Sequence, residues 1–428
     1  MINFLPAPSK RFPLVKFPGQ IRQFKRAKYV LASLIDLLLI VVILLNGLQP
    51  AKNLIEPLVS PLHPLTNSKT STEVFGFAPF WTLDKLDNVN FNVLTTLAYF
   101  GIEVGGDGNL LQDSPGYEAF YSDKVTRLFK KAHASSTRVV LTLTQMDNYS
   151  ILQLMDDETA QQKAINQAIT EVQKRGIDGI NVDFEFDGDP GSRYKTKFSQ
   201  FVAKLTEQMH QANSSSRVTV SVYAASIKEP KIYDIPTLGR LSDGIFMMAY
   251  DFATTGSQHA IPTAPLYGTN SPRGYWYDIS SAVNDFLQVM PPDKLILGVP
   301  YYGYNYLVYS PQVKAETRPL YSWRGKPKAQ TYQIVQDEIK PEMEGIDEFV
   351  EGRDPDSQVP YKAYHIADTD TWRIVFTDDK QSLALKYDFA KQKNLAGVGI
   401  WALGFDEGKQ ELWHLLAEKF GSKLAAND

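Results

Sequence analysis

The residues whose types and spacing could do chemistry lie in one short stretch, from Asp178 to Asp187. As a strand, this stretch places apolar side chains on one side and Asn181, Asp183, Glu185 and Asp187 on the other. It follows a helical pattern in the middle of the chain, so we expect neither face to meet bulk water. Like charges about 7 Å apart raise each other's pKa, and burial raises it further. Such a strand could keep one carboxylic acid protonated near neutral pH, as general acid catalysis requires. The alternative is an edge strand whose acidic face is solvated.

The composition is that of a globular protein with a large core. The chain has 428 residues, of which 43% are hydrophobic and 21% charged, so it could form one large barrel or two to three ordinary domains. The net charge is −4 and no basic strip follows residue 30, so we expect no binding to nucleic acid. The 22 Tyr and 6 Trp suit sugar binding, because their ring faces can stack on the C–H groups of a pyranose.

Metal and thiol chemistry have no support in the sequence. The absence of cysteine excludes disulfides, thiolate catalysis and Cys-type zinc sites. The six histidines are scattered, without a pair spaced to share a metal ion. We therefore expect neither a cofactor nor a metal site.

The N-terminal region has the pattern of a membrane anchor. Residues 1–28 carry seven Lys and Arg and no Asp or Glu, and residues 29–48 are predominantly apolar, with Asp36 as the exception. A helix of that length crosses a hydrocarbon core, and the positive flank predicts a cytoplasmic N-terminus and an exported remainder. We expect an uncleaved single-pass anchor in the cell membrane. The alternatives are a cleaved signal peptide, which would give a secreted protein, and a buried soluble helix. The Pro-rich residues 49–71 are predicted to be a linker.

From residue 72 to residue 424, short apolar runs alternate with helical patterns. Apolar residues recur at helical spacing in 158–175, which Gly176 ends, and in 196–212. Eight strand units with intervening helices over about 350 residues predict an α/β fold, a (β/α)₈ TIM barrel. A doubly wound open sheet is the alternative, but no glycine-rich phosphate loop follows the first strand. The predicted strands are Glu73–Phe80, Val93–Phe100, Arg138–Thr144, Gly179–Glu185, Arg217–Tyr223, Gly244–Tyr250, Lys294–Tyr301 and Gly397–Leu403.

The spacing between the last two predicted strands is too long for one helix. A helix is expected near 380–394, which leaves residues 305–375 for an inserted α+β subdomain between strands seven and eight. Within it, Tyr361–Ile366 and Thr371–Phe376 have strand patterns. If it walled a binding cleft, the insertion would favour processing of a chain.

Several predicted strands end in aromatic or polar residues, where the active site of a (β/α)₈ enzyme lies. Aromatic side chains around two carboxylates suit a neutral sugar ring and the acid-catalysed cleavage of a glycosidic bond. Each aromatic residue taken alone is more often part of the core. Besides Asp183 and Glu185, the candidates are Phe80, Trp81, Tyr223, Met248, Tyr250, Asp251, Tyr301 and Trp401.

Residues 178–185, DGINVDFE, resemble the DGxDxDxE signature of glycoside hydrolase family 18, the chitinase-like hydrolases. Met248–Asp251 resembles the family's MxYD segment, and 397–401 resembles its strand-eight Trp segment. The run from Val375 to Gly404 is similar to the branch that contains bacterial spore-cortex and peptidoglycan N-acetylglucosaminidases. The resemblance extends from about residue 72 to residue 420.

This resemblance implies retaining hydrolysis without a protein nucleophile, in which the N-acetyl oxygen of the substrate attacks the anomeric carbon. Carried over by position, Glu185 is the general acid and then the general base, and Asp183 orients and stabilises the acetamido group. Tyr250 donates a hydrogen bond to the acetamido oxygen, Trp401 lies under the sugar of the −1 subsite, and Asp251 positions polar groups there. The predicted substrate-binding residues are Trp401, Asp251, Met248, Asn181, Phe80, Trp81, Tyr223 and Tyr301.

The chain departs from the family pattern at two positions and also differs from the spore enzymes, which often carry LysM repeats. Asn181 replaces an Asp that in chitinases is thought to share a proton with the next Asp; it can hydrogen-bond Asp183 but cannot take a proton, and the spore-type branch also tolerates Asn there. Residues 142–146, TLTQM, lack the SxGG pattern of chitinases, which argues against chitin more than against glycosidase activity. The chain has no LysM wall-binding repeats, and the anchor would replace them. Asp187 has no assigned role.

The leading hypothesis is a membrane-anchored hydrolase of β-1,4-linked N-acetylglucosamine-containing glycans, with peptidoglycan ahead of chitin and a monomeric catalytic domain outside the membrane. One alternative is a non-catalytic, lectin-like protein of the same fold. Such relatives usually lose the acidic Glu, whereas this chain keeps Glu185, Asp183 and Tyr250. Another alternative is an exported structural barrel whose acidic strand only faces solvent.

Overall fold

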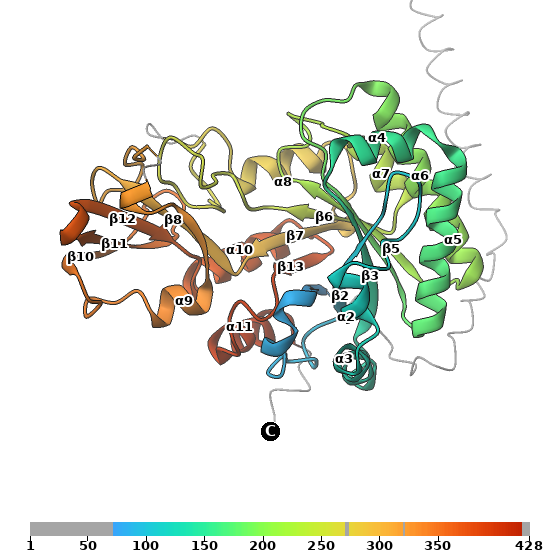
Figure 1. Ribbon diagram of the computed structural model, residues 1–428, viewed down its shortest axis with the longest axis horizontal. Helices are drawn as coiled ribbons and strands as arrows, with labels where there is room; N and C mark the ends of the chain where they lie inside the picture. Colours follow the sequence, from blue (N-terminus) through green and yellow to red (C-terminus); the bar gives the residue numbers. More distant parts are fainter. Residues whose placement is uncertain (1–71, 270–273, 320–321, 422–428) are drawn as a thin grey trace, which may run out of the picture. The chain divides into compact units, whose positions relative to one another are not determined.

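Eight parallel strands close into a barrel, shown at the right of Figure 1. The computed structural model describes residues 72–269, 274–319 and 322–421. The order around the barrel is β1-β13-β7-β6-β5-β4-β3-β2, so every strand has a hydrogen-bonded neighbour on both sides. The predicted (β/α)₈ barrel is confirmed, and the open sheet is excluded. The strands are β1 (Glu73–Pro79), β2 (Thr96–Glu103), β3 (Arg138–Gln145), β4 (Gly179–Phe184), β5 (Arg217–Tyr223), β6 (Gly244–Met248), β7 (Leu295–Pro300) and β13 (Gly397–Trp401).

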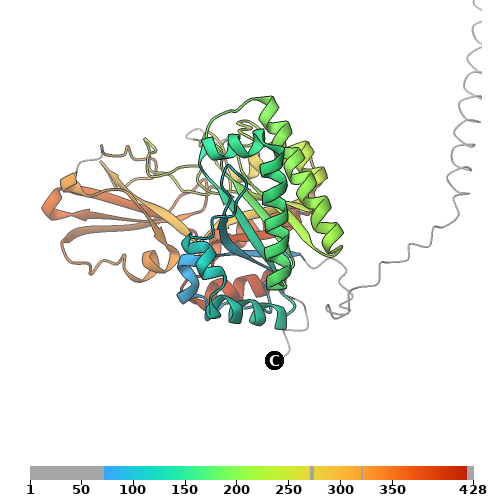
Figure 2. The same cartoon turned by 45° about the vertical axis from the view of Figure 1, so that its right-hand side comes forward.

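Helices cover the outside of the barrel, as Figures 1 and 2 show for α5 and α6. Helix α5 (Glu158–Arg175) begins where the Asp157 side chain accepts hydrogen bonds from two backbone N–H groups, and it ends at Gly176, whose φ of 61° is favourable for glycine. Both ends match the predicted helix. The other helices around the barrel are α2 (Pro115–Phe120), α3 (Asp123–Ala134), α4 (Asn148–Asp156), α6 (Ser192–Ala212), α7 (Ile235–Leu241), α8 (Ile279–Leu287), α10 (Lys380–Gln392) and α11 (Gln410–Phe420).

The barrel interior is filled by side chains, so it is a core and not a channel. Phe75, Phe77 and Phe246 form an aromatic cluster inside it, with the Phe77 and Phe246 ring centroids 4.8 Å apart. A second, larger core lies between the strands and the surrounding helices. Because the interior is closed, a ligand can bind the barrel only at an end of its strands.

Strand β4 lies between β3 and β5, and all six of its residues are buried. Its first residue must be small, because a Cβ on Gly179 would lie 2.0 Å from the backbone oxygen of Arg217 in β5. The solvated edge strand is therefore excluded. The polar side of β4 faces the inside of the barrel, where Asn181 and Asp183 are buried.

The insertion between β7 and β13 is an antiparallel sheet of order β10-β11-β12-β8-β9, seen at the left of Figure 1. Its two faces are covered by separate apolar clusters, one of which includes the short helix α9 (Tyr332–Asp337). The predicted strands at 361–366 and 371–376 are confirmed. The strands are β8 (Tyr302–Val308), β9 (Lys328–Thr331), β10 (Ile346–Arg353), β11 (Pro360–Ile366) and β12 (Thr371–Phe376).

Several predicted boundaries differ from the structure. The insertion begins at Tyr302, directly after β7, and not at residue 305. Strand β2 begins three residues later than predicted, because residues 90–94 form a turn whose N–H groups bond to the carbonyl oxygen of Asn90. Strand β13 ends at Trp401, and the residues after it turn back, with the N–H of Phe405 bonded to the carbonyl oxygen of Ala402.

The predicted membrane anchor, residues 29–48, lies outside the described residues, as do the linker, residues 49–71, and the basic N-terminal segment. Between residues 72 and 421, short gaps aside, no helix combines the length and the apolar character that a membrane span requires.

Two ion pairs lie where the insertion returns to the barrel. Lys386 of α10 and Asp378 form a hydrogen-bonded ion pair, and their side chains are 0% and 2% exposed. The neighbouring Asp379 begins α10 as its N-cap and is bound by both terminal nitrogens of Arg353 in β10. These contacts join the outer strand of the insertion to a helix of the barrel.

We expect Lys386→Met to lower the free energy of unfolding by about 3–5 kcal/mol, because it leaves Asp378 buried without its counter-ion. Urea denaturation of the full chain measures the loss. The double variant Lys386→Met/Asp378→Asn, which removes both charges, should recover most of it. Equal losses in the single and double variants would contradict this account of the pair.

Candidate active site

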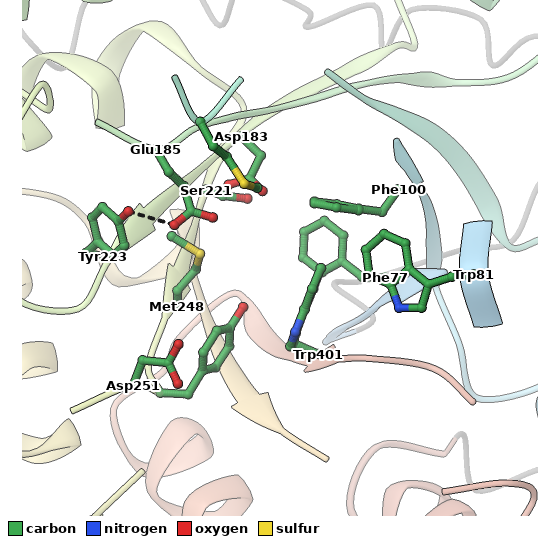
Figure 3. A pocket seen from close by; sticks show the side chains of 12 residues that line it. Phe77, Trp81, Phe100, Asp183, Glu185, Ser221, Tyr223, Met248, Asp251 and Trp401 are labelled. Atoms are coloured by element: carbon green, nitrogen blue, oxygen red, sulfur yellow. Dashed lines mark hydrogen bonds between the residues drawn. The ribbon is translucent and has the colours of Figure 1, made fainter. Parts of the chain in front are cut away.

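A cavity of about 290 Å³ opens at the C-terminal ends of the barrel strands, and Figure 3 shows its lining. Carboxylates and hydroxyls occupy one side, and Phe77, Phe100, Trp81 and Trp401 occupy the opposite side. The lining residues are Phe77, Trp81, Phe100, Met146, Asp183, Glu185, Ser221, Tyr223, Met248, Tyr250, Asp251 and Trp401.

The two carboxylates of β4 are positioned by the pairing of that strand. Asp183 pairs in register with Thr144 of β3 and is 3% exposed. Glu185 follows the last strand residue, and its N–H still bonds to the carbonyl oxygen of Gln145 at 2.8 Å. Alternation along β4 therefore brings both acids to the cavity. The hydroxyl of Tyr223 in β5 donates a hydrogen bond to Oε2 of Glu185 at 2.6 Å.

Burial dominates the electrostatics of this pair. Burial raises the pKa of the Asp183 carboxyl well above its usual range, the negative charge of Glu185 raises it further, and the Ser221 hydroxyl opposes both. Burial also raises the pKa of Glu185, where the hydrogen bond from Tyr223 and the charge of Lys231 act against it and Asp251 adds to it. A carboxylic acid that stays protonated closer to neutral pH is what general acid catalysis requires.

Asn181 precedes the two acids on β4, and its side chain forms hydrogen bonds with the neighbouring strand β5. Its Oδ1 accepts a hydrogen bond from Thr219 at 2.8 Å, and its Nδ2 donates one to Ser221 Oγ at 3.1 Å. The side chain of Asn181 therefore forms its hydrogen bonds with β5 and not with Asp183. It can influence Asp183 only by positioning the hydroxyl of Ser221. Oδ1 of Asp183 has no hydrogen-bond partner within the described part of the chain.

A third carboxylate, Asp251, enters the cavity from the loop after β6. Its Oδ1 accepts hydrogen bonds from Tyr302, from Tyr304 at 2.9 Å and from Thr263 at 3.1 Å. Burial raises the pKa of this carboxyl, and the three hydroxyl donors lower it. Asp251 has a φ of 59°, a left-handed conformation that costs free energy in a residue other than glycine and often marks functional sites. The insertion thus contributes two hydroxyl groups from β8 to the edge of the cavity.

The aromatic wall is centred on Trp401. The ring centroids of Phe100 and Phe77 lie 4.8 Å and 5.4 Å from that of Trp401, and both pairs are edge-to-face. Trp81, 51% exposed, extends the wall toward solvent, 6.4 Å from Trp401. An apolar wall opposite hydrogen-bonding groups fits a pyranose ring, which has C–H faces and hydroxyl edges.

Eight of the residues singled out from the sequence line this one cavity: Trp81, Asp183, Glu185, Tyr223, Met248, Tyr250, Asp251 and Trp401. Phe80 lies outside the lining because it begins a 3₁₀ helix (Phe80–Lys85) and packs against the outer core. Tyr301 is also outside it, because it is 1% exposed in that core and its hydroxyl faces that of Tyr387 at 3.4 Å. Asn181 lies below the lining.

Sequence reasoning missed four lining residues: Phe77, Phe100, Met146 and Ser221. Phe77 and Ser221 could have been found by the alternation along their strands, because each points inward two residues before a strand end. Phe100 was assigned to a strand end but not to the site. Met146 directly follows β3, and no local pattern in the TLTQM segment indicates that its side chain reaches the cavity.

Asp187 lies beyond β4, outside the cavity lining, with its side chain 98% exposed. Its Oδ1 lies 3.4 Å from Nζ of Lys231, and its backbone is tied to the Asn148 side chain by two hydrogen bonds of 2.8 Å. Across residues 72–421, apart from the short undescribed gaps, no group of three or more His, Asp or Glu is arranged to hold a metal ion.

Residues 67–406 match the family Glycosyl hydrolases family 18. The chain belongs to this family.

Among curated relatives of this family 18 hydrolase, the probable endochitinase of Caenorhabditis elegans is 28% identical over 274 residues, which cover 60% of this chain and 42% of that protein. The chain thus spans less than half the length of the nematode protein. The cortical fragment-lytic enzyme of Bacillus subtilis is 20% identical over 341 residues, which cover 76% of this chain and 68% of that enzyme.

The fold of this family 18 hydrolase has solved counterparts. The crystal structure of the group IV chitinase of Ostrinia furnacalis superposes with a TM-score of 0.68 at 20% identity, over 82% of this chain and 100% of the insect chain. At this identity the likeness supports the barrel fold.

We expect Asp183→Asn to raise the free energy of unfolding at neutral pH by roughly 0.5–2 kcal/mol, the range of ordinary stabilising substitutions. Because the folded-state pKa of Asp183 lies above its unfolded value, ionisation of this carboxyl destabilises the fold above the unfolded pKa of about 3.9. The gain should therefore be present at pH 7 and vanish as the pH falls below about 4.

Denaturation curves from pH 4 to pH 8 test this expectation. Asp178→Asn is the control, because the Asp178 carboxylate accepts a hydrogen bond from the backbone N–H of Val139 and bonds to His133, so its replacement should destabilise the protein. A loss of stability at pH 7 in Asp183→Asn would show that the buried charge is compensated.

Proposed function

We propose that this family 18 hydrolase cleaves β-1,4-linked N-acetylglucosamine-containing glycans by substrate-assisted, retaining catalysis, with peptidoglycan ahead of chitin as substrate. The observation that carries the proposal is the pair of buried Asp183 and partly buried Glu185, both with raised pKa values, opposite an aromatic wall. That arrangement supplies a proton donor and a surface for a neutral sugar ring in one cavity.

In the first step, the carbonyl oxygen of the substrate's acetamido group attacks the anomeric carbon. The bond from that carbon to the glycosidic oxygen breaks, its electron pair stays on the leaving oxygen, and Glu185 gives this oxygen a proton. In the second step, a water molecule attacks the anomeric carbon of the oxazolinium ion and gives a proton back to Glu185. The oxazolinium ring opens, the acetamido group is restored, and the sugar retains its anomeric configuration.

The other site residues have roles in binding the reacting sugar. Asp183 faces the positive charge that develops on the acetamido group, and Tyr250, from the end of β6, donates a hydrogen bond to its oxygen. Tyr250 is partly buried, and desolvation holds the pKa of its hydroxyl well above the usual range, so it remains a donor at any pH where the enzyme works. Trp401 lies under the ring, and Asp251 binds a hydroxyl at its edge.

The lining favours an uncharged sugar at the cleavage point. Three carboxylates, Asp183, Glu185 and Asp251, line the cavity, and no Lys or Arg is among its lining residues. An N-acetylglucosamine unit fits this charge, whereas a sugar with its own carboxylate would be repelled. Support for peptidoglycan comes from the similarity to the spore-type branch, including the Bacillus relative, and from the predicted anchor, which would hold the enzyme near a cell wall.

The alternative is a lectin-like protein of the same fold that binds such glycans without cleaving them. Glu185 is evidence against it, because sugar binding alone does not require a partly buried acid whose ionisation destabilises the protein.

Glu185→Gln should lower the rate of glycan hydrolysis by at least about 100-fold, the lower range for loss of a general acid. Affinity for the same glycan should change little, because the amide preserves the shape of the side chain. Reducing-end release from peptidoglycan and from N-acetylglucosamine oligosaccharides measures the rate, and calorimetric titration measures the binding.

Glu207→Gln is the matched control for this experiment, because Glu207 lies exposed on α6 and its replacement should change neither quantity. If the natural protein bound these glycans but released no reducing ends, the lectin alternative would hold instead.

We also propose that residues 29–48 anchor the protein in the cell membrane with the barrel on the outer side, on the strength of their apolar length and the basic flank before them. The full chain should then remain in the membrane fraction after an alkaline wash. Protease added to intact spheroplasts should digest the barrel and spare a tag placed at the N-terminus. A shorter protein free in the medium would show that the segment is a cleaved signal peptide.

A further inference from the structure

Tyr223 contacts only one of the two oxygens of Glu185. Its hydroxyl lies 2.6 Å from Oε2, and Figure 3 shows it on the side of Glu185 away from the aromatic wall, while the second oxygen faces the cavity. The phenol keeps its own proton, since burial and the charge of Glu185 hold the pKa of Tyr223 far above its usual range. Oε2 is therefore the acceptor in this bond, and Oε1 is left to carry the acid's proton.

The ring of Tyr223 is held on two sides. Nζ of Lys231 lies 4.4 Å from its centroid, in the position of a cation–π contact, and the ring of Tyr233 meets it at 63° with 5.9 Å between centroids. The hydroxyl of Tyr233 is itself fixed to the carbonyl oxygen of Phe184, at the end of β4, at 2.8 Å.

Lys231 is held in place in turn. It has a φ of 49°, a left-handed conformation that a residue other than glycine adopts at a cost in free energy. Its Nζ lies 3.4 Å from Oδ1 of Asp187. A positive charge at the ring strengthens the hydroxyl as a hydrogen-bond donor, and Asp187 offsets part of that charge.

We propose that Tyr223, held between Lys231 and Tyr233, is a positioning residue that directs the transferable proton of Glu185 to Oε1 and sets the pH at which this acid loses it. The inference rests on the proposed role of Glu185 as general acid. It assigns functions to Lys231 and Asp187, neither of which lines the cavity.

The direction of each contribution follows from charge. The Tyr223 hydroxyl and Lys231 both favour ionised Glu185, whereas Asp187 acts against them by offsetting Lys231. The titratable and charged groups that face Glu185 and Tyr223 are Asp183 from β4, Asp187 from the loop after it, Lys231 and Tyr233 from the segment after β5, and Tyr250 and Asp251 from the end of β6.

The decisive experiment is the pH dependence of kcat/KM for an N-acetylglucosamine oligosaccharide. The basic limb is the fall of kcat/KM at high pH, where Glu185 loses its proton. In Tyr223→Phe this limb should move to higher pH by about one unit, the shift expected for losing one hydrogen bond to an ionised carboxylate. Lys231→Met should move it in the same direction by a smaller amount, and Asp187→Asn in the opposite direction by a smaller amount still, because Asp187 is exposed and screened.

Tyr194→Phe is the matched control. It removes a tyrosine hydroxyl that donates a hydrogen bond to another carboxylate, Asp156, and neither residue lines the cavity, so the limb should stay where it is. A basic limb that Tyr223→Phe leaves unmoved, or shifts of the same sign in Lys231→Met and Asp187→Asn, would overturn the proposal.

A titration that does not depend on turnover separates this proposal from the proposed function. The carboxyl band lost in Glu185→Gln identifies Glu185 in infrared difference spectra of the full chain, and its midpoint should rise in Tyr223→Phe. A raised midpoint in a protein that hydrolyses no glycan would support the role of Tyr223 and would rule out the proposed hydrolytic function. An unchanged midpoint in an active enzyme would reject the role of Tyr223 alone.

Discussion

The closure of the barrel restricts the contact of Asp183 and Glu185 with water to the cavity at the strand ends, and the rest of the site depends on this constraint. Strand β4 has a paired strand on each side, and an aromatic cluster fills the interior of the barrel below the cavity. Each ionised carboxylate then loses hydration that the protein replaces only in part, with hydroxyl donors from Ser221 and Tyr223. The two acids consequently hold protons at higher pH than they would in water, which gives the cavity its chemistry.

The insertion belongs to the site as well as to the fold. Strand β8 starts directly after β7, so its first residues remain at the mouth of the barrel, and Tyr302 and Tyr304 donate hydrogen bonds to Asp251. The buried pair Lys386–Asp378 joins the other end of the insertion to α10. A sheet tied to the barrel at both ends can hold hydroxyl groups in fixed positions beside a buried carboxylate.

Features that repeat along the chain could be predicted from the sequence, and features that arise between distant strands could not. The alternation in 178–187 places Asp183 and Glu185 on one side of a strand, and Gly176 marks the helix end before it.

The bonds of Asn181 to Thr219 and Ser221 depend on the register between β4 and β5, which no local pattern specifies. Tyr301 and Tyr302 are neighbours of the same type, and only the bend from β7 into β8 decides that Tyr302 contacts Asp251 and Tyr301 enters the core. Strand β10 shows no apolar alternation in the sequence, because Asp347, Glu348 and Glu351 are exposed, as an edge strand allows.

The central claim is that the cavity supplies an acid and an electrostatic partner but no nucleophile, so that the substrate's own acetamido group completes the reaction. Proton NMR during hydrolysis of an N-acetylglucosamine oligosaccharide tests it most directly, because it identifies the anomer released before mutarotation. The account predicts that the β-anomer appears first and that a matched oligosaccharide without N-acetyl groups is not cleaved. Early appearance of the α-anomer, or equal cleavage of the deacetylated oligosaccharide, would contradict it.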